Sequence, residues 1–215
     1  MKENLFQTQY DVTKKTRLKK FYDEKKFLIF SFILVVVIIF ASFSYYSENQ
    51  KKKRILLAEN YIKAKVYIIN NDQNRAKDIL NDIILANDST YSVLSLFLIL
   101  NENLISNDKT IVDLFDHVLK NNKFEKEIEN LIIYKKILFQ SNYINESELL
   151  EMTKPLINSE THWKPHALLL IGDYFVHKKE YVKAKEFYKQ VLSLKNLHAE
   201  LYQQASSQLI LIENE

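Results

Sequence analysis

Apolar residues divide the chain into one short uninterrupted stretch and a longer part in which apolar and polar positions alternate. Residues 27–46 read FLIFSFILVVVIIFASFSYY and carry no charge over twenty positions. At a rise of about 1.5 Å per residue, a helix of this length matches a hydrocarbon core of about 30 Å. The stretch therefore predicts a transmembrane helix, with Tyr45 and Tyr46 placed for an aromatic belt and basic residues on both flanks.

A buried core helix and a cleaved signal peptide are the two alternatives to a membrane span. A core helix of this length would show a polar face, whereas the polar residues before Tyr45 are serines alone. A signal peptide would have a shorter basic region than residues 1–26 and an apolar region of about 7 to 15 residues. We therefore expect an uncleaved anchor.

After Arg54 the chain alternates between amphipathic segments and short polar breaks, which predicts one helix after another. Residues with three-four spacing form the expected core faces, for example around Phe115, Tyr188 and Leu209. Asn145 and Glu148 form a capping-box pattern, and Pro165 is placed for the first turn of a helix. The predicted breaks are residues 70–74, 86–90, 106–109, 121–123, 141–145 and 158–162.

Composition favours the same all-α fold. The chain contains one glycine and two prolines, although hairpins, sandwiches and phosphate-binding loops all use glycine for positive-φ turns. It contains no cysteine, which excludes disulfides, thiolate catalysis and cysteine-ligated metal sites. The composition thus leaves an all-α protein without cysteine chemistry.

The last amphipathic segments fit a 34-residue repeat. With Pro165 as position 1, Gly172 falls at position 8, Phe175 at 11, Ala184 at 20 and Tyr188 at 24. Small residues at positions 8 and 20 let two helices approach closely, while the aromatic residues fill the remaining space. This pattern resembles a tetratricopeptide repeat, with Lys179 where a turn glycine is usual and Asn196 where proline is usual.

A second frame opens at Leu57 and places Ala64, Tyr67, Ala76 and Leu80 at positions 8, 11, 20 and 24. The two frames start 108 residues apart, which leaves room for two degenerate units at about 90–122 and 124–158. We therefore expect an N-terminal transmembrane helix followed by a tetratricopeptide-like α-solenoid of about four helical hairpins plus a C-terminal helix. The predicted parts are a basic tail (1–26), the span (27–46), a basic juxtamembrane segment (47–56) and the repeat domain (57–215).

The order of basic tail, anchor and four hairpins resembles the bacterial family of the ancillary subunit of the Sec translocon. Residues 149–157, the tripeptide at 163–165 and residues 167–192 resemble its alphaproteobacterial branch. The resemblance implies an inner-membrane protein with a periplasmic repeat domain that contacts the translocon, periplasmic chaperones or exported clients.

Charge is distributed unevenly along the chain. The tail carries a net charge of +4 and residues 47–54 carry +3, so the total of +3 leaves −4 for the domain after Arg54. A nucleic-acid partner would require positive charge on the folded domain, so we expect none. The tail has eight basic residues and the twenty residues after the span have six, which favours a cytoplasmic N-terminus and a periplasmic domain.

Catalytic motifs are missing from the sequence, which contains no nucleophile elbow, phosphate loop or HExxH pattern. His162 with His166, and Asp173 with His177, have the four-residue spacing of metal ligands on a helix, but no third ligand is evident. Trp163 is expected to pack between hairpins in preference to forming a ligand hot spot. We therefore expect no enzyme activity, no cofactor, no metal and no small-molecule substrate.

Inner helices of such repeats line a concave surface, and the frames give candidates for a partner groove. The candidates are Tyr61, Lys65, Ile68, His166, Leu169, Asp173 and His177. Each of these positions could equally be solvated or packed inside the domain. The leading hypothesis is a membrane-anchored protein-interaction module that assists protein export, and the alternative is a structural scaffold for a division, wall or respiratory-maturation complex.

Overall fold

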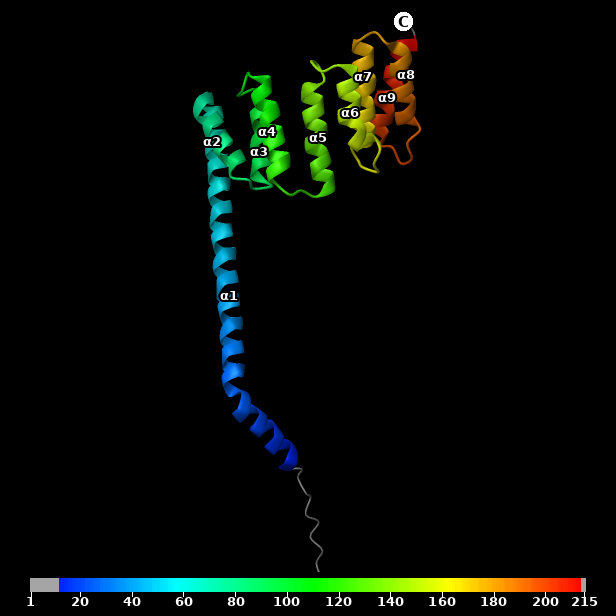
Figure 1. Cartoon of the computed structure of the whole chain (residues 1–215). Helices are drawn as coiled ribbons and strands as arrows, with labels where there is room; N and C mark the ends of the chain where they lie inside the picture. Colours follow the sequence, from blue (N-terminus) through cyan, green and yellow to red (C-terminus); the bar gives the residue numbers. More distant parts are fainter. Residues whose placement is uncertain (1–11, 214–215) are drawn as a thin grey trace, which may run out of the picture. The chain divides into compact units, whose positions relative to one another are not determined.

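The structure is a computed structural model that describes residues 12–213, except for the side chains of residues 12–18 and 23. Residues 1–11 of the predicted basic tail lie outside this range. The chain divides into two units, Met1–Leu56 and Leu57–Glu215 (Figure 1). The predicted repeat domain also begins at residue 57.

Helix α1, Val12–Ile69, contains the predicted span. Among the described residues it is the one helix long and apolar enough to cross a membrane, and none of its most apolar window is buried. Phe32, Ile33, Leu34 and Val35 are all half or more exposed. Four consecutive residues point to all sides of a helix, so no side of this segment is covered by other described residues.

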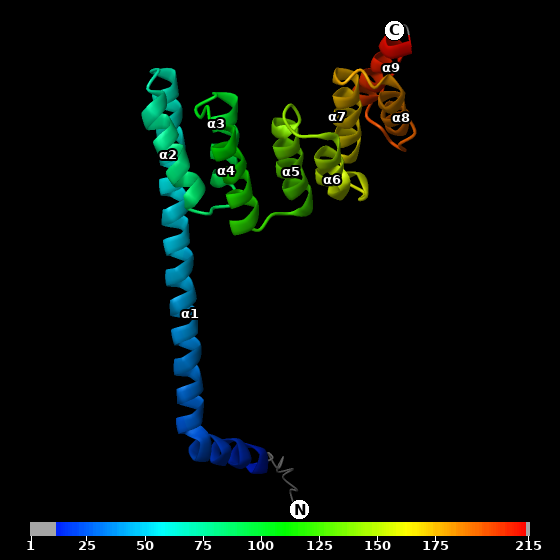
Figure 2. The ribbon, with the colours of Figure 1, turned by 45° about the horizontal axis from the view of Figure 1, so that its top comes forward.

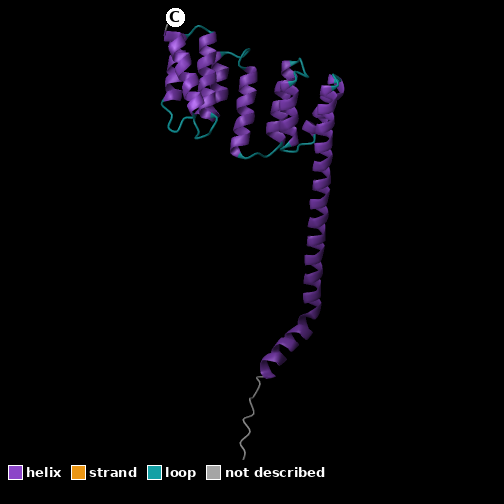
Figure 3. Ribbon diagram, turned by 180° about the vertical axis from the view of Figure 1, so that it is seen from behind, coloured by secondary structure: helices purple, strands orange, loops and turns teal. Residues whose placement is uncertain are grey.

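The second unit consists of the end of α1 and a series of shorter helices. These are α2 (Gln73–Leu85), α3 (Tyr91–Asn101), α4 (Asp108–Asn121), α5 (Lys126–Gln140), α6 (Glu146–Ile157), α7 (Lys164–His177), α8 (Tyr181–Leu192) and α9 (Ala199–Glu213). No strand occurs in the part of the chain that the structure describes, as Figure 3 shows. The prediction of an all-helical protein is confirmed.

Helix starts follow local sequence signals. Asp72 and Asn107 accept hydrogen bonds at their side chains from backbone N–H groups in the first turns of α2 and α4. Asn145 and Glu148 form the predicted capping box at the start of α6, and Pro165 lies in the first turn of α7. These contacts satisfy N–H groups that a helix start leaves unpaired.

Helices α2 to α9 pack mainly on their neighbours in sequence (Figure 2). The buried side chains form two clusters, one from the end of α1 to α5 and the other from α5 to α9. Helix α5 contributes Ile132 to the first cluster and Ile137 to the second. The two hydrophobic cores of this unit therefore meet at α5.

The first and last hairpins have different combinations of small and large residues at equivalent positions of the two predicted frames. In the first hairpin, the fully buried Ala64 and Leu80 occupy positions 8 and 24. In the last, Gly172 lies under the ring of the fully buried Tyr188, and a Cβ added at Gly172 would come within 2.5 Å of Tyr188 Cε1. The missing Cβ therefore makes space for the larger ring.

Residues other than glycine adopt left-handed backbone conformations at helix ends. Asn71, Asn103 and Lys179 have φ values of 59°, 50° and 60°. After each of them, the next backbone N–H donates to the carbonyl oxygen five residues earlier, at 2.8 to 3.0 Å. This is the hydrogen-bond pattern of a Schellman motif, in which glycine is the usual residue. Asn71 and Lys179 also occupy the same position, 15, in their two repeat frames.

Replacing Lys179 by glycine is expected to stabilise the second unit by about 0.5–1 kcal/mol, since glycine has no Cβ penalty at positive φ. Thermal unfolding followed by circular dichroism should show a midpoint about 1–4 °C higher. The matched control is Lys189→Gly at an exposed position inside α8, where glycine should destabilise the helix by about 1 kcal/mol. A lower midpoint for Lys179→Gly would contradict this account of the turn.

Candidate protein-binding groove

The three groove candidates of the first predicted repeat unit lie on the end of α1. Lys65 is exposed, whereas Tyr61 and Ile68 are half-buried against the first core cluster. The ring of Tyr61 contacts the ring of Tyr91 on α3, with 6.3 Å between the ring centroids. Only part of this set is therefore open to a partner.

The candidates of the last predicted unit lie in three different environments along α7. His177 is exposed, His166 and Asp173 are half-buried, and Leu169 is only 3% exposed. The side chain of Leu169 belongs to the second core cluster and offers almost no surface to a partner. The repeat frame assigned this position to an inner helix but did not show which side of α7 its neighbours cover.

Half-buried His166 and Asp173 have partners inside the domain. The Tyr188 hydroxyl donates a hydrogen bond to Asp173 Oδ1 at 2.6 Å. Burial raises the pKa of Asp173, and the hydrogen bond from Tyr188 opposes this shift. Burial also lowers the pKa of His166, which keeps its imidazole largely neutral at pH 7. Both residues therefore have a packing role between α7 and its neighbours.

Trp163 packs at the junction of the third and fourth hairpins, as the sequence predicted. Its indole Nε1 donates to the carbonyl oxygen of Glu127 at 3.0 Å. Its ring stacks on Tyr134, with 5.5 Å between centroids, and lies 5.3 Å from the ring of His166. These contacts join the start of α7 to α5.

No group of three or more His, Cys, Asp or Glu side chains suited to a metal ion occurs within residues that the structure describes. His162 instead lies beside Glu127, with 3.3 Å between His162 Nδ1 and Glu127 Oε2. Burial acts to raise the pKa of Glu127, but hydrogen bonds from Thr161 and His162 bring it below its ordinary value. This arrangement connects the α6–α7 loop to α5.

An open apolar groove lies between α3 and α5 of the second unit. It consists of two cavities, of ≈ 270 Å³ and ≈ 660 Å³, which both have Phe97 in their walls. We call it the α3–α5 groove. Its lining residues are Ser89, Thr90, Val93, Leu94, Phe97, Ile99, Leu100, Asn101, Asn103, Ile111, Lys123, Phe124, Glu125, Ile128, Leu131, Lys135, Leu138 and Phe139.

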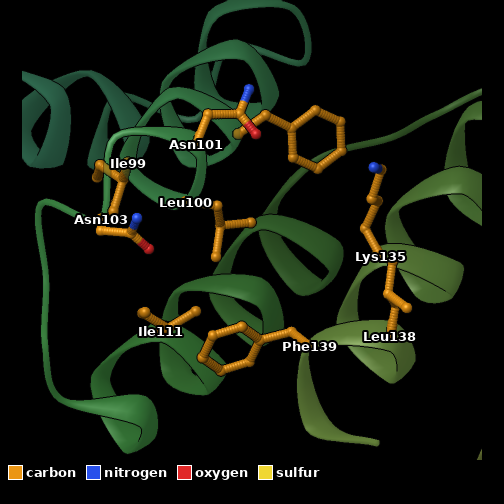
Figure 4. A pocket seen from close by; sticks show the side chains of 9 residues that line it. Ile99, Leu100, Asn101, Asn103, Ile111, Lys135, Leu138 and Phe139 are labelled. Atoms are coloured by element: carbon orange, nitrogen blue, oxygen red, sulfur yellow. The ribbon is translucent and has the colours of Figure 1, made fainter.

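The groove exists because α3 and α5, both described in full, are not packed closely on each other, whereas α5 packs on α7 and α7 on α9. Helix α4 packs on both α3 and α5 and contributes Ile111 to the lining of the groove. The rings of Phe115 on α4 and Phe139 on α5 contact each other at a centroid distance of 6.4 Å. In Figure 4, Leu100 comes from α3, and Phe139 and Lys135 come from α5 on the other side.

Apolar side chains in this groove remain accessible to solvent. Leu94 is 40% exposed, Ile128 43% and Leu138 39%. Such a contiguous apolar surface, bordered by polar groups, is typical of a protein-interaction site. The sequence did not indicate it, because Leu94 and Ile128 fall on ordinary apolar stripes of their own helices. Leu94 and Ile128 are uncovered because α3 and α5, which are not neighbours in sequence, are not packed closely on each other.

Comparisons with protein-family models, with curated proteins and with solved structures found no match for this chain.

Proposed function

We propose that this protein is a non-catalytic, membrane-tethered protein-binding module. The α3–α5 groove carries the proposal, since it offers an open apolar surface in a unit whose chain is continuous with a candidate membrane span. Tethering would hold that groove at a high effective concentration near other membrane proteins. Partner binding is then a matter of apolar contact in the groove, with specificity from the polar groups at its border.

A tetratricopeptide-like solenoid is the architecture that we propose for the second unit. Its support is that the hairpins 108 residues apart share three features of their frames. Small buried residues occupy position 8 (Ala64 and Gly172), left-handed residues occupy position 15 (Asn71 and Lys179), and buried alanines occupy position 20. A repeated hairpin that stacks on itself produces the extended inner surface used by such repeats for binding.

The membrane part of the proposal is an uncleaved single-pass anchor at residues 27–46. Its support is an uncharged segment of sufficient length that the described residues leave uncovered. The balance of basic residues favours an N-terminus in the cytoplasm and a domain in the periplasm. Protease treatment of intact spheroplasts tests this, since digestion of the domain without lysis is the expected result and protection would reverse the orientation.

We further propose that the partners belong to the protein-export machinery of a bacterial inner membrane, which rests on the layout resemblance to the ancillary subunit of the Sec translocon. A photo-reactive amino acid at Leu94, in native membranes, is expected to crosslink to translocon subunits, chaperones or exported clients. The matched control is the same amino acid at Val182, which is 77% exposed on α8 and outside the groove.

The partners that crosslink at Leu94 decide between the versions of the proposal. One fixed division, wall or respiratory complex, stable through purification, would support the scaffold and contradict the export role. Absence of any crosslink specific to Leu94 over Val182 would contradict a binding function for the groove itself.

A further inference from the structure

We propose that the partner segment bound by the α3–α5 groove is an amphipathic α-helix with an apolar stripe of about three turns and acidic residues at one end. This inference rests on the proposed protein-binding function and specifies the chemistry of the partner. Three observations support it: the length of the groove, the polarity of its walls and the charges at its border.

The length of the α3–α5 groove and its helical walls fit a helical partner. The groove runs along α3, whose 11 residues measure about 16 Å at 1.5 Å per residue. Its two walls are helices, and a third helix can place one side chain per turn between them. The partly exposed Leu94 and Ile128 lie on opposite walls of the same cavity, so one apolar stripe would cover both.

Backbone polarity argues against an extended segment. An extended peptide would bring unpaired N–H and C=O groups into the groove, and each such group needs a hydrogen-bond partner when buried. No strand edge is present among the described residues to pair with them. A helix satisfies these groups internally, so it can bury its apolar face on Leu94, Phe97 and Ile128 without that cost.

The charged side chains at the border of the groove indicate which charge to expect on the partner. Lys135 lies at the end of the groove where Asn101 and Asn103 are, and Lys123 and Glu125 lie at the other end. Within the described residues neither of these lysines forms an ion pair, unlike Lys136, which pairs with Asp116. The border thus has two basic side chains and one acidic one, which favours carboxylates on the partner, next to Lys135.

A synthetic helix can test this directly. The probe is a fluorescent peptide of about 14 residues with leucines at helical positions 1, 4, 5, 8 and 11 and glutamates at one end. Two further peptides are a scrambled one of equal composition and one with lysines in place of the glutamates. Binding to the full-length protein in nanodiscs is measured by fluorescence anisotropy, with circular dichroism to confirm that each variant is folded.

We expect the acidic peptide to bind at least about tenfold more tightly than the scrambled one. Replacing Leu94 and Ile128 together by glutamine should weaken its binding by about tenfold or more, because the apolar contacts are lost. Lys135→Glu should reverse the preference, so that the lysine peptide binds more tightly than the acidic one. Val182→Gln, outside the groove, should leave all three affinities unchanged.

Equal binding of the acidic and scrambled peptides would overturn the inference, and so would binding that is insensitive to the Leu94 and Ile128 substitutions. Self-association of the protein that the same substitutions abolish, measured by analytical ultracentrifugation, would assign the groove to a second copy and overturn it as well. A groove-specific crosslink at Leu94 without peptide binding would leave the proposed function standing and reject only the helical partner.

Discussion

Replacing Gly172 by leucine is expected to unfold the last hairpin. A Cβ at this position would already lie 2.5 Å from Tyr188 Cε1 and 2.9 Å from two further ring carbons. Tyr188 is fully buried and its hydroxyl is hydrogen-bonded to Asp173, so the ring has no free space to move into. Over-packing by a single residue costs about 1–3 kcal/mol, and leucine adds three more carbons to the same contact.

Alanine at Gly172 separates the steric effect from helix propensity. Alanine favours a helix over glycine by about 0.5–1 kcal/mol, so at an open site this substitution would stabilise the protein. Here we expect a net loss of about 1–2 kcal/mol in the free energy of unfolding, measured by urea titration. A gain in stability would show that the Tyr188 ring yields to the added methyl group.

A double substitution can test whether the two positions form one packing unit. The first hairpin has Ala64 and Leu80 where the last has Gly172 and Tyr188. Gly172→Ala combined with Tyr188→Leu copies the first hairpin, so its loss of stability should be smaller than the two single losses added together. A coupling of at least about 1 kcal/mol is expected for residues in direct contact. Strict additivity would argue against this interpretation.

Arginine at both Val36 and Val37 is expected to release the protein from the membrane. These residues lie at the centre of the apolar segment, and one arginine at the centre of a span costs about 2.5–3.5 kcal/mol on insertion scales. The fraction of the protein that pellets with membranes after alkaline carbonate treatment should therefore fall from nearly all to a small part. The intact mass of the membrane-bound protein, measured alongside, distinguishes an uncleaved anchor from a processed signal peptide.

The control for this experiment is the same number of arginines at exposed apolar positions of the helical unit. Val182 is 77% exposed and Ile210 is 61% exposed, so arginine at both should leave the membrane fraction unchanged. If the variant with arginines at positions 36 and 37 still resists carbonate, residues 27–46 are not the anchor.

The sequence predicted the helices well because their signals are local. Asn145 and Pro165 mark helix starts by their own chemistry, and the predicted polar breaks overlap the segments between successive helices of the second unit. The largest deviation is the α3–α4 connection, which was predicted at residues 106–109 but begins at Glu102. There the buried Leu104 and half-buried Ile105 made a loop resemble a helix, because a loop residue can also enter the core.

The candidate site could not be predicted in the same way. Whether an apolar side chain is buried depends on the helices that cover it, and those helices come from distant parts of the chain. Leu169 and Leu94 illustrate both outcomes. The repeat frame assigned Leu169 to the predicted partner groove, yet its side chain is in the core. Leu94 had the pattern of a core residue, yet it is 40% exposed. Repeat position gives the helix to which a residue belongs, but not the spacing between helices.

The position of helix α5 between the two hydrophobic clusters affects how the second unit unfolds. Among the described residues it alone supplies buried side chains to both hydrophobic clusters, through Ile132 and Ile137. Such a unit is expected to open in two cooperative parts, with amide hydrogens exchanging at a different rate on each side of α5. A helix bound in the α3–α5 groove would contact side chains of the first cluster, such as Phe97 and Phe139, so ligand binding should slow exchange before α5 more than after it.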